Sequence, residues 1–235
     1  MSISFTVSSF INLANKYFVF AVWCRMMETQ KSHRAYREKE VVKRLCKVLQ
    51  DHGQIIHVKA DVRPASSSIF RDKWDKLTRG IGLKLQPQID ILLEAETYQK
   101  SRQTILCGIE VKYFEKAGSR FNWSFYAGID EAIATLNYGL DHSALWQIFS
   151  PSTEKGNLVQ YGAPFWKHIE KLKLPIEFSL LVDRGSDFDV HAKTGEYSFK
   201  LSENLIAFNK PNPIKDEALQ IQLREMLYEW CKFDS

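Results

Sequence analysis

Three side chains with the types and spacing for metal-assisted chemistry interrupt two apolar segments of the chain. Asp90 lies within the run IDILLEA, and Glu110 and Lys112 lie within the run TILCGIEVKYF. Residues two positions apart share a face of a strand, so Glu110 and Lys112 project side by side. Asp90 lies on the face opposite its apolar neighbours. If the two strands pair through a hairpin, Asp90 lies beside the other two side chains.

Two carboxylates and an ammonium on one face are suited to divalent-metal chemistry. Carboxylate oxygens bind Mg²⁺ or Mn²⁺, which keep several waters and accept phosphate oxygens as further ligands. Such a metal lowers the pKa of a bound water and neutralises the charge that builds up on a phosphate under in-line attack. Lys112 can hold the attacking water, and we expect Gly108 to leave space on the same face near the metal. The alternative is an ordinary exposed strand face with a Glu–Lys pair, which explains an Asp within an apolar run poorly.

The segment PQID, ending at Asp90, followed by EVK, from Glu110 to Lys112, resembles the PD-(D/E)xK phosphodiesterase superfamily. This superfamily includes restriction enzymes, archaeal Holliday-junction resolvases and RecB-type nucleases. The resemblance implies that Asp90 and Glu110 bind metal, with the main-chain carbonyl of Val111 as a further ligand. It gives Lys112 the water-activating role. The order of elements supports the resemblance over residues 34–182, whereas the EVK triplet alone would arise by chance in many proteins.

The resemblance also implies side chains from two helices. Members of the superfamily add a Glu from the first helix, and Glu38 shares the helical face of the apolar residues that follow it. Glu40 lies among basic residues, where surface ion pairs explain it, so we predict Glu38 as the catalytic residue. Relatives use a Gln or Tyr from the helix after the EVK strand, and here Tyr126 and Glu131 occupy that region. Glu131 is either a metal or phosphate contact or a solvated helix residue.

The hydrophobic pattern predicts an α/β protein. Segments with apolar residues at helical spacing alternate with short continuous apolar runs, and polar connections separate them. The expected fold is a restriction-endonuclease-like mixed central sheet flanked by helices, with an αβββαβ core and C-terminal additions. The expected elements are a helix at 27–51, strands at 54–62, 89–95 and 104–114, a helix at 124–140, a strand at 143–149, a helix at 164–173, a strand at 176–182 and a last helix from about 212.

The N-terminal segment and the cysteines bear on the membrane and redox environment of the protein. We expect residues 1–26 to form an N-terminal extension of uncertain role and residues 27–235 to form the nuclease-like domain. The stretch 3–23 has the length of a membrane span, but Lys16 near its centre disfavours insertion. A start at Met26 or Met27 is a further alternative. The four cysteines are scattered without a CxxC pair, which favours a reduced, cytoplasmic protein over a zinc or iron–sulfur protein.

Basic residues gather in the connection at 63–84, with Phe70 and Trp74 interleaved. Such a segment suits contacts to a nucleic-acid backbone, and the alternative is a solvated loop. A formal net charge of +4 is compatible with a polyanionic partner. The predicted nucleic-acid contacts are Arg71, Lys73, Lys76, Arg79 and, beyond the EVK strand, Arg120. A second acidic cluster, at 183–191, lacks calcium-loop spacing and is predicted to be a polar turn.

The sequence therefore predicts a Mg²⁺-dependent nuclease, with Mn²⁺ as a substitute, that cleaves DNA phosphodiester bonds by water attack. An endonuclease is favoured over an exonuclease, and RNA as a substrate and a homodimer are left open. The main alternative is a catalytically inactive nucleic-acid-binding module of the same fold. A third is a membrane-tethered nuclease.

Overall fold

A helix at 37–50 begins the part of the chain that the computed structural model describes. The chain divides into two units, Met1–Glu40 and Val41–Ser235. Only residues 37–40 of the first unit are described, so the predicted extension at 1–26 lies outside the described residues. The structure describes residues 37–66, 68, 70–79, 88–97, 103–117, 120–121, 127–192 and 196–232.

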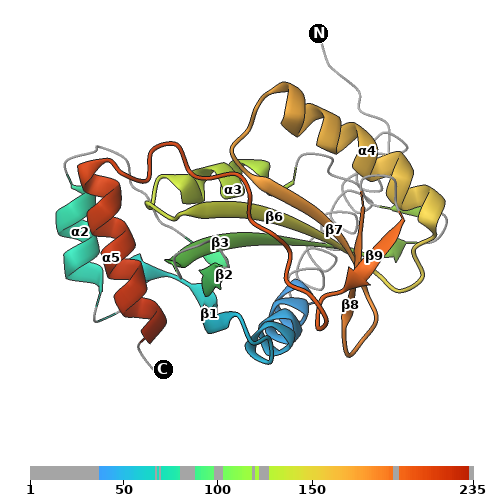
Figure 1. The fold of residues 1–235 in the computed structure, drawn as a ribbon, viewed down its shortest axis with the longest axis horizontal. Helices are drawn as coiled ribbons and strands as arrows, with labels where there is room; N and C mark the ends of the chain where they lie inside the picture. Colours follow the sequence, from blue (N-terminus) through green and yellow to red (C-terminus); the bar gives the residue numbers. More distant parts are fainter. Residues whose placement is uncertain are drawn as a thin grey trace, which may run out of the picture. The chain divides into compact units, whose positions relative to one another are not determined.

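A seven-stranded mixed sheet runs through the second unit (Figure 1). Its central strand, β6, is parallel to both of its neighbours, and the other adjacent strands pair antiparallel. In spatial order the strands are β1 (Ile55–Val62), β2 (Ile89–Thr97), β3 (Gln103–Phe114), β6 (His142–Phe149), β7 (Glu177–Asp183), β8 (Phe188–His191) and β9 (Tyr197–Lys200). A separate two-stranded ribbon pairs β4 (Lys116–Ala117) with β5 (Arg120–Phe121).

Residues 41–49 of the first helix cover one face of the sheet. Their apolar side chains recur at helical spacing and pack against the odd-numbered residues of β2 and β3. The buried cluster joins Val41, Val42, Leu45, Cys46 and Leu49 of the helix to strand residues that include Ile91, Ile109, Val111 and Trp146. Because strand side chains alternate, Glu110 and Lys112 project from the other face.

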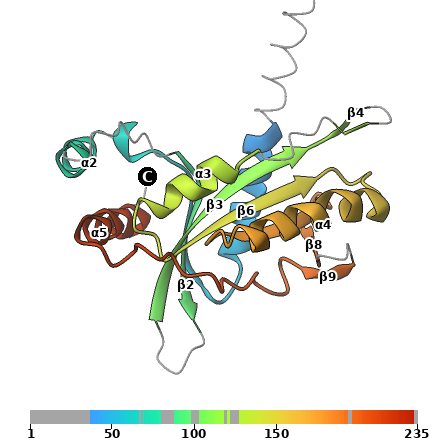
Figure 2. The same cartoon turned by 90° about the horizontal axis from the view of Figure 1, so that it is seen from above.

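Four of the described helices lie over that other face, which we call the α3 face. They are α2 (Arg71–Thr78), α3 (Ile129–Leu136), α4 (Lys155–Lys171) and α5 (Ala218–Lys232). Figure 2 shows α3 lying along β3 and β6, with which it is in contact. The packing of α4 is dominated by aromatic residues of β6 and β7, whereas α2 and α5 pack together over Leu92 and Leu106. The predicted α/β fold with a mixed sheet flanked by helices is therefore confirmed.

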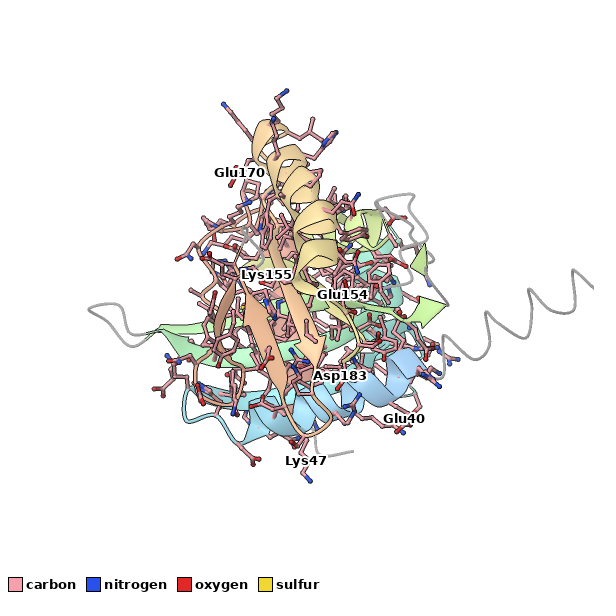
Figure 3. The ribbon with its side chains drawn as sticks, turned by 90° about the vertical axis from the view of Figure 1, so that its right-hand side faces the viewer. Glu40, Lys47, Glu154, Lys155, Glu170 and Asp183 are labelled. Carbon is pink, nitrogen blue, oxygen red and sulfur yellow. The ribbon has the colours of Figure 1, made fainter. Side chains whose placement is uncertain are left out.

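The acidic cluster at 183–191 forms a hairpin: a polar turn follows Asp183, as predicted, but Asp189 and His191 lie in β8. Asp183 binds both guanidinium nitrogens of Arg44, at 2.6 and 2.5 Å, and accepts the Gly185 N–H at 2.8 Å. Asp187 accepts the Ser202 hydroxyl, and Asp189 binds Arg184 at 2.6 Å. Figure 3 shows Asp183 at the end of β7 near the first helix, with Lys47 pointing away from the sheet.

Two expectations for the connections were wrong. The segment 63–84 contains helix α2 rather than only a polar loop, because Phe70 and Trp74 are buried against Trp230 and Tyr138. These two aromatic rings therefore serve the core and are not available to nucleic acid. The last helix begins at Ala218 rather than near 212, where the Asn212 amide instead donates to main-chain carbonyls at the end of α3 and beyond it.

Two further observations concern membrane-spanning helices and the state of the cysteines. Within the ranges described above, none of the helices combines the length and apolar character that crossing a membrane requires. The three cysteines in those ranges, Cys46, Cys107 and Cys231, are buried free thiols. Burial raises the pKa of the Cys46 and Cys231 thiols to about 12, which keeps them protonated and unreactive near neutral pH.

Candidate active site

Asp90 is held at the start of β2 by the main chain of β3. Its Oδ2 accepts a hydrogen bond of 2.9 Å from the Val111 N–H. The antiparallel register pairs Ile91 with Ile109, so its continuation places Asp90 opposite Glu110 on the α3 face. The two carboxyl groups lie within hydrogen-bonding reach of each other. The predicted neighbourhood of Asp90, Glu110 and Lys112 is therefore what the strand pairing produces.

The two carboxyl groups disfavour each other's charge. Burial raises the pKa of Glu110, and the neighbouring Asp90 carboxylate raises it further, against the opposing effect of the Lys112 ammonium. Burial also raises the pKa of Asp90, although the Val111 N–H and the Lys112 ammonium act in the other direction. Only 4% of Glu110 is exposed, so water does little to relieve this repulsion. A cation placed between the two groups would relieve it.

Lys112 links the strand pair to helix α3. Its Nζ lies 2.5 Å from Glu110 Oε1 and 2.9 Å from Glu131 Oε2. Glu131 is in the first turn of α3 and its side chain is half exposed, so it reaches Lys112 from the solvent side. The structure thus brings Glu131 to the predicted site, as a partner of the lysine.

Gly128 is a part of this arrangement that the sequence reasoning missed. It precedes α3 with a φ of 89°, in the left-handed region that favours glycine. A Cβ there would lie 2.6 Å from Leu145 Cδ1 and 3.0 Å from Lys112 Cγ. The aliphatic part of Lys112 therefore passes directly along the backbone at Gly128. The run YAGID was visible in the sequence, but nothing in it indicated where the lysine would lie.

The expectation for Gly108 was wrong. A Cβ at this position would meet Leu140 Cδ1 at 2.4 Å, with Thr135 and Ile89 also nearby. The space beside Gly108 is thus filled by core side chains and is not open for a metal. The glycine permits close packing of the segment after α3 against β3, which helps to position α3.

Several predicted residues are not brought to this site by the described structure. Glu38 belongs to the unit Met1–Glu40, and its place in the site stays a prediction. Tyr126 lies outside the described residues. Arg120 lies in β5, and its contact with nucleic acid also stays a prediction. The other four predicted contacts with nucleic acid are exposed on α2 and the residue after it: Arg71, Lys73, Lys76 and Arg79. Lys73 pairs with Glu229 of α5 at 2.7 Å.

Gln147 is the second residue that the sequence reasoning missed. The parallel register of β3 and β6 places it beside Lys112, on the α3 face. It is fully buried, and neither atom of its amide has a hydrogen-bond partner among the described residues. A signal existed in the sequence, because Gln147 is a large polar residue near the centre of the otherwise apolar strand SALWQIF.

The donor set fits a hard divalent cation. Asp90 and Glu110 offer carboxylate oxygens from adjacent strands, and their mutual repulsion would be relieved by a cation bound between them. Across the described ranges, no group of three or more His, Cys, Asp or Glu side chains is gathered in one place. Such a cation would therefore take its other ligands from main-chain oxygen, water or substrate, as Mg²⁺ commonly does. Val111, whose carbonyl is the predicted third ligand, is the residue whose N–H binds Asp90.

No family model, curated protein or solved structure significantly matches this chain.

Proposed function

We propose that this chain is a divalent-metal-dependent nuclease of the PD-(D/E)xK type that hydrolyses DNA phosphodiester bonds. The observation that supports this most is the pairing of the buried Glu110 carboxyl group with the half-buried Asp90 carboxyl group, beside the Lys112 ammonium. Such a cluster disfavours its own charges, and a divalent cation bound between the carboxylates would compensate them. The parallel β3–α3–β6 unit lies next to the antiparallel strands β1, β2 and β3. This arrangement is compatible with a restriction-endonuclease-like core.

The residues divide the work of hydrolysis among them. A bound Mg²⁺ or Mn²⁺ supplies an activated water and neutralises charge on the phosphate. Asp90 and Glu110 hold that cation, and the Val111 N–H keeps the Asp90 carboxylate in one orientation. Lys112 orients the attacking water and stabilises the negative charge that develops on the phosphate. Glu131, which is paired with Lys112 at the solvent side, keeps the ammonium near the surface of the site.

DNA is the proposed substrate because positive charge is available near the sheet. The chain carries a formal net charge of +4, and α2 with the residue after it exposes two arginines and two lysines against two aspartates. Contacts from such side chains would bind the phosphate backbone without reading sequence. RNA carries the same backbone charge as DNA, so the assay includes RNA beside duplex, single-stranded and branched DNA.

The test compares full-length wild type with Lys112→Ala in Mg²⁺ and Mn²⁺. We expect wild type to cleave at least one DNA substrate and the variant to lose about 10²–10⁴-fold in rate, which is the range for a positioned acid–base group. DNA binding in Ca²⁺ and the unfolding midpoint report whether the variant stays folded. Lys155→Ala, an exposed lysine at the start of α4, is the matched control and should cleave like wild type.

The outcomes separate the candidate functions. Cleavage by wild type that Lys112→Ala leaves unchanged would refute the assignment of the site. DNA that is retarded but never cut, in either metal, would favour a binding module with no catalytic role. A loss of rate in both lysine variants would point to a general effect of charge on DNA binding rather than to chemistry at Lys112.

A further inference from the structure

Gln147 carries a buried amide that has no hydrogen-bond partner among the described residues. A buried amide that leaves its donors and its acceptor without partners has lost its hydrogen bonds to water and gained none in return. The described structure leaves both Oε1 and Nε2 of Gln147 in this condition. An apolar side chain of the same size would be at least as stable there. Positions where a residue opposes stability in this way are commonly functional.

The neighbours of Gln147 on the α3 face identify the side from which a partner can come. Along β6 its neighbours are Leu145 and Phe149, and across the sheet they are Lys112 on β3 and Leu180 on β7. Lys112 is the one polar side chain among these four. Beyond Phe149 the face is closed by an aromatic cluster, in which the Tyr161 ring lies 5.5 Å from that of Phe149. Among the neighbours of Gln147 in the sheet, Lys112 is therefore the one that can pair with its amide.

Lys112 and the proposed cation compete for one carboxylate. The lysine Nζ lies 2.5 Å from Glu110 Oε1. Glu110 is also a proposed metal ligand, and a cation bound to it weakens its attraction for the ammonium. Glu131 Oε2, 2.9 Å from Nζ, then holds the ammonium from the solvent side, and a second acceptor on the buried side would keep it at the site. Gln147 Oε1 is an acceptor in the adjacent register position, and an amide carbonyl is neutral, so it does not compete for the cation as a carboxylate would.

We propose that Gln147 is a positioning residue for Lys112. Its amide oxygen accepts a hydrogen bond from the Lys112 ammonium when a divalent cation occupies Glu110, and so holds the ammonium at the reaction centre. This inference rests on the proposed function, because it requires that Asp90 and Glu110 bind a cation. It gives the Gln147 amide, which has no hydrogen-bond partner among the described residues, a partner at Lys112.

The test uses Gln147→Met, which keeps the length of the side chain and removes the amide. Gln220→Met is the matched control, since Gln220 is also buried and its Oε1 also lacks a partner, but it lies on α5. The main measurement is Mn²⁺ binding to full-length protein by calorimetry. We expect the Kd of Gln147→Met to rise about 10-fold, as is typical when a group that supports a metal site is removed. The Kd of Gln220→Met should equal that of wild type.

Two further measurements distinguish positioning from packing. The unfolding midpoint of metal-free Gln147→Met should equal or exceed that of wild type, because a buried unpaired amide has been removed. On a cleaved substrate kcat should fall about 10-fold while KM stays within about 2-fold, because Lys112 acts on the chemical step. A lower unfolding midpoint would show that Gln147 stabilises the core, and would overturn the inference.

The failure of this inference differs from the failure of the proposed function. If wild type binds Mn²⁺ and Gln147→Met binds it equally well, the positioning role is refuted while the nuclease proposal stands. An equal loss of affinity in Gln220→Met would refute it as well, because the effect would not be specific to the register position beside Lys112. If wild type binds no Mn²⁺ and cleaves nothing, both proposals fail.

Discussion

Glu110 on β3 and Asp183 at the end of β7 are buried carboxylates of the same sheet, but their surroundings treat charge in opposite ways. Asp183 faces a bidentate arginine and a main-chain N–H. Burial by itself would raise its pKa, but these hydrogen bonds outweigh burial and the pKa of Asp183 is lowered. Glu110 faces a lysine together with a second carboxyl group, Asp90, and its pKa is raised.

The difference shows what each carboxylate contributes to the molecule. Asp183 has enough hydrogen-bond donors to compensate its charge. Its ion pair with Arg44 links the first helix to the sheet. Glu110 and Asp90 have less positive charge around them than two ionised carboxylates need. An apolar residue could take the place of either one on its strand. The Asp90–Glu110 pair therefore costs stability in the metal-free protein, and a function that needs a cation would explain why it is there.

The largest effect that would test this contrast is expected from Glu110→Gln. The substitution removes a proposed metal ligand, so Mg²⁺-dependent cleavage should fall by about 100-fold or more. The metal-free variant should nevertheless unfold about 2–4 °C above wild type, because repulsion by Asp90 and the burial of a charge are removed. Cleavage assays and thermal unfolding with and without Mn²⁺ measure the two effects.

A lower unfolding midpoint for metal-free Glu110→Gln would contradict the contrast. It would place Glu110 with Asp183 among carboxylates that stabilise the fold, with Lys112 as its structural partner. Addition of Mn²⁺ gives an independent check, since binding to the folded state stabilises wild type and should leave the variant unchanged.

A smaller effect is expected from Gly128→Ala, which disturbs the lysine without touching its charge. The left-handed backbone would cost about 1–2 kcal/mol in stability. The new methyl group would also press on the Lys112 side chain, 3.0 Å from its Cγ. We therefore expect kcat to fall about 10-fold, since small misplacements of reacting groups are costly. Chemical denaturation and steady-state kinetics measure these effects.

Gly53→Ala is the control for that substitution. Gly53 lies in the turn after the first helix, where an added Cβ meets nothing within 4 Å and no positive φ is recorded. Its stability and rate should stay close to those of wild type. A Gly128→Ala protein with reduced stability but normal kcat would show that the close approach to Lys112 does not matter for chemistry.

Sequence alone predicted the strand-borne part of the site because a strand has a period of two. Asp90, Glu110 and Lys112 interrupt apolar runs, and their alternation fixes the face from which they project. The same reasoning failed for Gly108, because a missing side chain indicates close approach without saying what approaches. In this case it is Leu140, from the segment after α3.

The helices show a second limit of the sequence. The hydrophobic pattern does not predict helix α2, because only Trp74 and Thr78, one turn apart, mark its buried face among charged residues. Asn212 before Pro213 looked like the start of a helix, yet its amide binds the carbonyls of Leu136 and Leu140. In both cases a contact between distant segments decides the local structure, and no window of sequence contains it.

The smallest expected effect comes from Asp183→Asn, the same kind of substitution as Glu110→Gln at the opposite type of carboxylate. It should destabilise the protein at pH 7 by about 1 kcal/mol, at the low end for charged hydrogen bonds because Arg44 is 36% exposed. Because the pKa of Asp183 is lowered in the folded state, its contribution is complete above the pKa of an unfolded Asp, about 3.9. It disappears as the pH falls through the lower folded value.

Urea denaturation of wild type and Asp183→Asn should therefore give a gap in unfolding free energy that is constant from pH 7 to about pH 5 and closes in stronger acid. A gap that widened in acid would mean that the pKa of Asp183 is raised, and would remove the distinction from Glu110. At pH 7 we expect Glu110→Gln to raise the unfolding free energy and Asp183→Asn to lower it. The sign of this change therefore distinguishes a carboxylate that stabilises the fold from one that destabilises it.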